Sequence, residues 1–356
     1  MTPTSRPVRV AICEDSYAYG RGLRRLLEAD GTIEVVGVAT SASELLERLP
    51  HWRPDLVTMD IELPGTLGGE EAIARIVAER PLPIVVLSAH AGTASRVTQA
   101  LAAGALEAFS KATLRLDDAV AGAAFRARIV ALARSEHGAA GPAPPPPPAA
   151  PAAPDPAGAT GSATPSPAPT RLPRPTVIGL VASAGGPRAL AAVLAPLPAT
   201  FPIPILLVQH MSPGFTAGLA TWLDDTVAIP VALAVAGAPL APGVHVAPED
   251  RHLLVAPDGR LTLATEPAHT RHRPSADVLL ESLARVAGPR ALAIVLTGMG
   301  RDGAVGVRAV REAGGRALAE SRESAAVWGM PAAALAEGAS PLTLEELGRA
   351  LAELAP

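Results

Sequence analysis

The spacing of apolar residues along positions 8–134 changes repeatedly between two patterns, and this predicts five repeats of a strand followed by a helix. Short apolar runs of strand length are separated by stretches in which apolar residues recur every three to four positions. Five such repeats favour a doubly wound parallel sheet, a (βα)5 α/β fold. The expected strands span residues 8–13, 33–38, 56–59, 84–87 and 106–109, and the clearest helical stretches span 18–27, 70–77 and 117–132.

A second α/β pattern follows residue 175. An apolar strand at 176–181 leads into a turn that contains Gly185, Gly186 and Pro187, and a helical stretch comes next. The pattern predicts a Rossmann-like α/β domain with a parallel sheet and a β-rich stretch around residues 230–265. Further strands are expected at 205–208, 231–234, 252–255, 261–264, 292–296 and 316–319, and helices at 275–286, 303–312 and 344–354.

The stretch between the two halves is rich in proline and alanine. Residues 138–175 hold 14 prolines in 38 positions, five of them consecutive at 144–148. Such a segment favours extended polyproline II and cannot build a packed core, so it is interpreted as a semi-rigid spacer, with a proline-rich docking ligand as the alternative. The expected organisation is a domain at 1–134, a flexible linker at 135–175 and a second domain at 176–356.

Composition narrows the class of protein. A net charge of −4 does not indicate the basic surface that nucleic-acid-binding proteins present. The single cysteine, Cys13, excludes an internal disulfide and fits a reducing cytoplasm. The first residues lack an apolar signal region, and the longest uncharged run, 189–209, is broken by four prolines. We therefore expect a cytoplasmic protein with no nucleic-acid partner and no membrane insertion.

Charged or polar side chains stand at the predicted strand ends of the first half. Glu14 and Asp15 follow the first strand, Asp60 the third, Ser88 the fourth, and Lys111, the one lysine among 30 basic residues, the fifth. The carboxyl ends of parallel strands meet at one edge of a sheet. Three carboxylates there suit Mg²⁺, and Asp60 beside a lysine suits phosphoryl transfer to a carboxylate. The alternative is that each acid is a solvated loop residue.

Residues 8–133 resemble a response-regulator receiver domain, through the motifs Glu14-Asp15-Ser16, Asp60 within residues 55–64, Ser88-Ala89 and Lys111. The resemblance implies that Glu14, Asp15 and Asp60 bind Mg²⁺ and that Asp60 is the phosphoacceptor. It also implies that Ser88 is the switch hydroxyl, that Lys111 senses the phosphoryl group, and that a histidine kinase of the chemotaxis type is the phosphodonor.

Two positions depart from the receiver pattern. Ala112 stands where the family usually has proline, and Ala108 stands where it often has an aromatic residue. A non-proline cis peptide bond costs about 3 kcal/mol, so we expect a trans or strained bond after Lys111.

Three strand ends of the second half carry a serine, a histidine and an aspartate. Ser183 precedes a glycine-rich turn, His210 follows the next strand, and Asp302 ends a glycine-rich loop. They could form the nucleophile, base and orienting acid of a hydrolase. Spacing alone leaves other readings open: Ser183 could bind a phosphate, His210 could be a core or loop residue, and Asp302 could cap the helix that follows.

Four segments of the second half, 182–187, 209–216, 273–277 and 296–304, closely resemble the catalytic domain of the chemotaxis protein-glutamate methylesterase family (CheB). The resemblance implies that Ser183 is the nucleophile, His210 the general base and acid, and Asp302 its orienting acid, with backbone around Met299 holding the oxyanion. It implies hydrolysis of glutamate methyl esters on chemoreceptors, deamidation of receptor glutamines, and no cofactor in this site. Ala184 replaces a threonine that is common in the family and could support the triad.

The family resemblance also implies that the first domain limits access to the second until Asp60 is phosphorylated. The competing hypothesis is a signalling module with a degenerate esterase site that acts by binding alone. The remaining histidines of the second half match no metal-ligand spacing, and we interpret them as surface or structural residues: His245, His252, His269 and His272.

Overall fold

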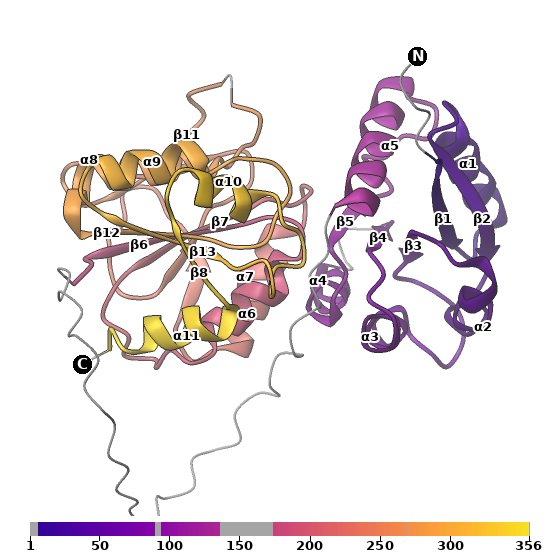
Figure 1. Cartoon of the computed structure of the whole chain (residues 1–356), viewed down its shortest axis with the longest axis horizontal. Coiled ribbons are helices and arrows are strands. Elements are labelled where there is room, and N and C mark those ends of the chain that lie inside the picture. Colours follow the sequence, from indigo (N-terminus) through magenta and orange to yellow (C-terminus); the bar gives the residue numbers. More distant parts are fainter. Residues whose placement is uncertain (1–5, 90–93, 136–173, 269, 356) are drawn as a thin grey trace, which may run out of the picture.

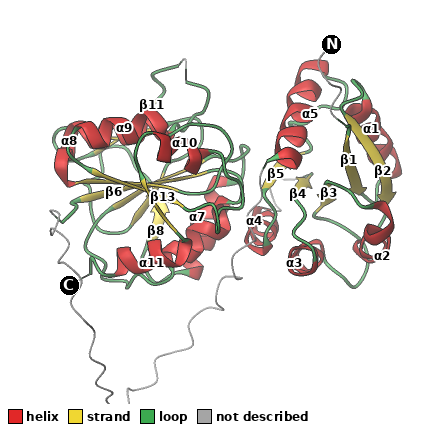
Figure 2. Cartoon of the chain, in the orientation of Figure 1, coloured by secondary structure: helices red, strands yellow, loops and turns green. Residues whose placement is uncertain are grey.

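The structure is a computed structural model that describes residues 6–89, 94–135, 174–268 and 270–355 (Figure 1). Most of the predicted linker, residues 136–173, lies outside the described residues, as does His269. The described part forms two α/β domains, each with a parallel sheet and helices packed against it (Figure 2), as the alternating patterns predicted.

The N-terminal sheet has five parallel strands in the order β2-β1-β3-β4-β5. All five predicted strands are confirmed, and four of them end one residue later than expected. Asp60 and Ser88 are consequently the last residues of their strands. The strands are β1 (Val8–Cys13), β2 (Ile33–Ala39), β3 (Leu56–Asp60), β4 (Ile84–Ser88) and β5 (Glu107–Ser110).

Five helices pack against this sheet, and polar caps mark where several of them begin. The Ser16 side chain accepts a hydrogen bond from the backbone of Tyr19, and Asp118 accepts two from the first turn of α5, which satisfies free N–H groups there. The helices are α1 (Tyr17–Glu28), α2 (Ala42–Trp52), α3 (Gly69–Glu79), α4 (Ala94–Ala103) and α5 (Ala119–Arg134).

The C-terminal sheet has seven parallel strands in the order β14-β13-β12-β6-β7-β9-β8, and β10 and β11 form a separate antiparallel pair. The predicted strands are confirmed. The sequence pattern missed β9 and β14, which have only three residues each. The strands are β6 (Val177–Ala182), β7 (Ile205–Gln209), β8 (Val231–Leu233), β9 (Val244–Val246), β10 (His252–Val255), β11 (Leu261–Ala264), β12 (Ala291–Val295), β13 (Arg316–Glu320) and β14 (Ser340–Leu342).

Helices lie on both faces of the C-terminal sheet, so its central strands β6, β7 and β12 are buried along their whole length. The described helices are α6 (Gly186–Leu194), α7 (Thr216–Thr226), α8 (Ala276–Ala287), η2 (Gly288–Arg290), α9 (Ala304–Glu312), α10 (Met330–Ala336) and α11 (Leu344–Ala352). None of the helices in the described part of the chain has the length and apolar character needed to cross a membrane.

The two domains touch through the α4-β5-α5 side of the N-terminal domain, which faces the C-terminal domain in Figure 1. Helix α4 packs against α6 and α7. Phe215, just before α7, is 2% exposed and packs into an apolar cluster of the N-terminal domain. Ala184 and Val327 join a second such cluster. The contact is therefore apolar at its centre and involves loops at the carboxyl edge of the C-terminal sheet.

Candidate active site and phosphorylation site

Ser183 lies directly after β6 in the turn that leads into α6, and it is 3% exposed. Its backbone N–H donates to Thr297 O at 3.0 Å, and its carbonyl accepts from the Gln209 side chain at 2.8 Å. A Cβ at position 298 would lie 2.7 Å from the Ser183 Cβ, so the close approach of the two loops requires Gly298. The serine is therefore held in a fixed turn against the loop that follows β12.

His210 and Asp302 come from the strands on either side of β6. His210 follows β7, and Asp302 lies in the loop after β12. The His210 Nε2 atom is 2.8 Å from Asp302 Oδ2, with side chains 9% and 11% exposed. Neither buried ring nitrogen of His210 has a hydrogen bond of regular geometry to the described residues. The serine, histidine and aspartate predicted from the sequence thus follow three adjacent parallel strands, and the histidine and aspartate are in contact.

The Asp302 carboxylate is anchored by the first turn of α8. Its oxygens accept hydrogen bonds from Ser275 Oγ at 2.9 Å, Ala276 N at 2.8 Å and Asp277 N at 3.0 Å. Burial opposes its charge, but the His210 imidazole and these donors outweigh burial and hold the pKa of Asp302 below its usual range. Asp302 therefore caps α8, not the helix α9 that follows it in sequence.

Asp277 completes a reciprocal arrangement. It lies in the first turn of α8 and accepts hydrogen bonds from Gly303 N at 2.9 Å and Gly306 N at 2.8 Å, at the start of α9. Asp302 thus caps α8, the helix that carries Asp277, and Asp277 caps α9, the helix that begins just after Asp302. Burial raises the pKa of Asp277 above its ordinary value, and the Asp302 carboxylate adds to that rise. The sequence pattern did not predict this role for Asp277.

His272, interpreted from the sequence as a surface or structural residue, lies against His210 in the candidate active site. Its ring stacks on the His210 imidazole, with centroids 4.3 Å apart and planes at 15°. Burial lowers the pKa of His272 to about 4, and the charges of His210, Arg128 and Arg271 act in the same direction while Asp302 opposes them. No spacing rule links the two histidines, because a loop rather than a shared helix or strand brings them together.

His252, in contrast, is structural. It is fully buried in β10, and its Nδ1 accepts a hydrogen bond from Ser275 N at 3.1 Å. Its Nε2 lies 3.2 Å from Thr270 Oγ1. Burial lowers the pKa of this imidazole, and its two contacts brace the segment before α8.

The candidate oxyanion groups flank Ser183. The Ala184 carbonyl accepts from Thr297 Oγ1 at 2.9 Å, which ties the Ser183 turn to the loop of Met299. Among the described residues, none accepts a hydrogen bond from the backbone N–H of Ala184 or of Met299. Both N–H groups thus lack a protein acceptor in the described part of the chain, while Ala184 itself is only 1% exposed.

The acidic strand ends of the N-terminal domain converge as predicted. Ligand oxygens of Glu14, Asp15 and Asp60 lie within 4.8 Å of one another. The Lys111 Nζ atom is 2.6 Å from Glu14 Oε2 and 2.6 Å from Asp60 Oδ2. Lys111 N donates to Ser88 O at 2.7 Å, so the fourth and fifth strands are joined at the same edge.

Electrostatics favour the charged form of Lys111 and oppose that of Glu14. Burial opposes the charge of Lys111, but its hydrogen bonds with Asp60 and Glu14 outweigh burial and raise the pKa of the lysine. Burial raises the pKa of Glu14, against the effect of Lys111. The bond between Lys111 and Ala112 is trans, as expected, because the cis bonds of the described residues precede Pro267 and Pro274.

Strand β5 forms the free edge of the N-terminal sheet and touches two loops of the candidate active site. The Leu106 carbonyl accepts from Gly185 N at 2.8 Å, beside Ser183. The Ala108 carbonyl accepts from Ser212 Oγ at 2.8 Å, two residues after His210.

Helix α5 reaches the third loop of the candidate active site. The Arg128 guanidinium lies 2.8 Å from the Met299 sulfur, and Glu107 holds that guanidinium with hydrogen bonds of 2.7 and 2.8 Å. All three loops are consequently in contact with one side of the N-terminal domain.

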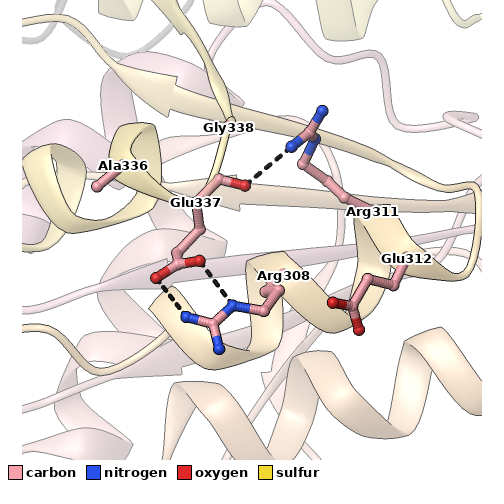
Figure 3. Close-up of a pocket in the computed structure, with 6 residues that line it drawn as sticks. All are labelled: Arg308, Arg311, Glu312, Ala336, Glu337 and Gly338. Carbon is pink, nitrogen blue, oxygen red and sulfur yellow. Dashed lines mark hydrogen bonds and ion pairs between the residues drawn. The ribbon is translucent and has the colours of Figure 1, made fainter.

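A separate hollow of about 390 Å³ lies beside α9 and α10 (Figure 3). An ion pair of 2.6 Å between Arg308 and Glu337 crosses it, and Arg311 donates to Glu337 O at 3.0 Å. None of the predicted site residues lines this hollow. Both of its arginines already bind Glu337.

Comparison with known proteins matches both halves of the chain. The model of the CheB methylesterase family matches residues 178–351, and that of the response regulator receiver domain matches residues 10–120.

Curated relatives match over nearly the full length. A protein-glutamate methylesterase/protein-glutamine glutaminase of Myxococcus xanthus is 40% identical, over 91% of this chain and 90% of the relative. One from Anaeromyxobacter dehalogenans is 39% identical, over 98% and 97%. The solved Thermotoga maritima CheB methylesterase catalytic domain is 37% identical, with a TM-score of 0.48, over 51% of this chain and 99% of that domain.

Proposed function

The chain belongs to the family of CheB methylesterases that carry a response-regulator receiver domain, and from this we propose that it is a phosphorylation-regulated protein-glutamate methylesterase. Its substrates are the glutamate 5-O-methyl esters of chemoreceptors, which it hydrolyses to glutamate and methanol. The relatives also carry the name protein-glutamine glutaminase, so the proposal includes hydrolysis of receptor glutamines to glutamate and ammonia. The observation that carries it is that Ser183, His210 and Asp302 follow three adjacent parallel strands, with His210 Nε2 2.8 Å from Asp302 Oδ2.

The proposed reaction is that of a serine hydrolase. Ser183 Oγ attacks the ester carbonyl while His210 takes its proton, and the imidazolium then gives that proton to the departing methoxide, which leaves as methanol. Water attacks the acyl-serine with His210 again as base, and glutamate and free Ser183 result. Asp302 orients the imidazole and stabilises its charged form. The cycle balances without a cofactor.

Two backbone donors support the charged intermediate in this proposal. The N–H groups of Ala184 and Met299 have no acceptor among the described residues, and they flank the serine turn. Donors aimed at the developing oxyanion lower the barrier more than donors aimed at the carbonyl of the substrate.

In the receiver domain, the proposal assigns phosphoryl transfer from a histidine kinase to Asp60. Its three acids, whose oxygens lie within 4.8 Å of one another, fit a hydrated Mg²⁺, which would offset negative charge on the phosphoryl oxygens. Lys111, 2.6 Å from Asp60, supplies a second positive charge and is joined by its own backbone to Ser88. Ser88 is the proposed switch hydroxyl.

The contacts between domains support inhibition by the unphosphorylated receiver. Leu106, Ala108 and Arg128 contact the loops of the three proposed catalytic residues. Lys111 directly follows β5, so a shift of Lys111 toward a phosphoryl group on Asp60 would move the strand that makes these contacts. We propose that phosphorylation releases the loops and opens the site.

The decisive assay measures methanol released from membranes that contain one chemoreceptor with tritiated methyl esters. The wild type should release methanol, and Ser183→Ala should reduce release to background. Equal release by both proteins would remove the serine assignment. Receptor binding with no release by the wild type would favour the binding-only module instead.

Regulation is tested in the same assay with acetyl phosphate and Mg²⁺. Labelling of Asp60 together with a rise in methanol release is expected. A labelled protein with unchanged release would exclude control by the receiver and leave the serine chemistry intact.

A further inference from the structure

A second imidazole lies against the proposed catalytic base. The rings of His272 and His210 are 4.3 Å apart at their centroids and nearly parallel, which is an offset stack. His210 follows β7, whereas His272 comes from the segment just before α8. The hydrolase chemistry described above gives His272 no part, although it covers a face of the base.

The segment that carries His272 is fixed on both sides. The buried ring of His252 accepts a hydrogen bond from Ser275 N at 3.1 Å and lies 3.2 Å from Thr270 Oγ1. Ser275 also donates to Asp302 at 2.9 Å. The same contacts therefore position both His272 and Asp302, the acid that contacts His210.

We infer that His272 is a positioning residue for the His210 imidazole, whose ring plane it sets by stacking. The inference rests on the proposed methylesterase activity, because it assigns His272 a part in the same reaction. His210 has to take a proton from Ser183 and deliver it to methoxide without a large reorientation, and a fixed ring plane favours both transfers.

The stacked ring also suits the charge that His210 acquires. An aromatic face attracts a cation, so a neutral His272 stabilises the imidazolium, whereas a protonated one would repel it. The charged groups that face His272 are Asp302, Arg128 and Arg271, together with His210 itself. With a pKa of about 4, His272 stays neutral throughout the range in which a serine hydrolase works.

The experiment compares non-aromatic and aromatic replacements in the phosphorylated full chain on methylated receptor membranes. His272→Ala and His272→Gln should lower kcat by about tenfold and leave KM within about twofold, because the base and not substrate binding is affected. His272→Phe should restore kcat to within about threefold of the wild type. His245→Ala is the matched control: this histidine bonds to Ala241 O in the same domain and should change neither constant.

The pH profile separates positioning from a general effect on folding. The acid limb of kcat reports protonation of His210 in the substrate complex. His272→Lys should move that limb to lower pH, because it places a fixed cation beside the base, while His272→Phe should leave it in place. Full activity in both His272→Ala and His272→Gln, or a phenylalanine variant no better than these, would overturn the inference. A wild type that releases no methanol would instead overturn the proposed function.

Discussion

The Arg128 guanidinium lies 2.8 Å from the sulfur of Met299, so a helix of the receiver directly contacts the loop that leads to Asp302. Glu107 fixes the guanidinium through two hydrogen bonds, and its side chain is 14% exposed. This contact joins the N-terminal domain to the loop that carries Asp302. Loss of the contact between Arg128 and Met299 should therefore weaken the proposed inhibition by the unphosphorylated receiver.

Arg128→Ala should raise the activity of the unphosphorylated protein. The substitution removes the contact with Met299, and loss of one partly buried contact of about 1 kcal/mol corresponds to roughly a three- to tenfold rise in the open population. Methanol release without phosphodonor measures this. Activity with saturating acetyl phosphate should stay near that of the wild type, since the contact has no role once the domains separate.

Arg126→Ala is the matched control on the same helix. Arg126 pairs with Asp30 at 2.8 Å and with Leu26 O at 3.0 Å, both within the receiver. It should leave basal release unchanged. The same rise in both variants would point to a loosened helix α5 instead of a lost contact with the catalytic loop.

Lys111→Arg should permit labelling of Asp60 but blunt the activation that follows. Nζ fits between Glu14 and Asp60 at 2.6 Å from each, in a side chain only 12% exposed. A planar guanidinium is wider than an ammonium and cannot occupy the same point. Acetyl phosphate labelling and methanol release, measured on the same samples, test this. Full activation by the labelled variant would show that Lys111 does not transmit the phosphorylation signal.

The sequence located most of the candidate residues because the fold itself brings them together. Once residues 176–181, 205–208 and 292–296 were expected as parallel strands, Ser183, His210 and Asp302 had to lie near one edge. The same reasoning grouped Glu14, Asp60 and Lys111, which the structure brings within hydrogen-bond distance. Strand ends are predictable because side-chain spacing encodes strands and topology aligns their ends.

Other parts of the site leave no such trace in the sequence. His272 reaches His210 through loop conformation, and no periodic pattern encodes that. The receiver contacts use the backbone carbonyls of Leu106 and Ala108, which every residue type possesses. The capping of α8 by Asp302 was likewise unexpected, because caps normally act on the adjacent helix.

Asp277→Ala should destabilise the catalytic domain by about 1–2 kcal/mol and lower kcat, because the N–H groups of Gly303 and Gly306 lose their acceptor and the Asp302 loop loosens. Asp277→Asn should preserve most stability, since its amide oxygen can accept from the same donors. Calorimetry of the full chain and methanol release check both results. Asp258→Ala, at an exposed turn, is the control; equal effects of Asp277→Ala and Asp258→Ala would contradict the capping argument.

Glu320, the last residue of β13, is fully buried and contacts the loop that follows β12. Its Oε2 accepts from Thr297 N at 2.7 Å, and its Oε1 has no hydrogen-bond partner in the described part of the chain. Burial raises the pKa of Glu320 from 4.5 to about 7. Because its pKa is higher in the folded state than in the unfolded state, ionisation of Glu320 costs stability. This cost begins above pH 4.5 and is complete above pH 7.

Glu320→Gln should remove this pH-dependent cost while the amide oxygen keeps the bond from Thr297. The advantage of the variant over the wild type in free energy of unfolding should grow between pH 5 and pH 8 by roughly 2–3 kcal/mol, given 1.36 kcal/mol for each unit of pKa. Calorimetry of the full chain at both pH values measures it. Glu323→Gln is the control, because Glu323 is exposed. The difference in free energy of unfolding between this variant and the wild type should stay the same from pH 5 to pH 8. A constant difference between Glu320→Gln and the wild type from pH 5 to pH 8 would mean that Glu320 ionises near its ordinary pKa.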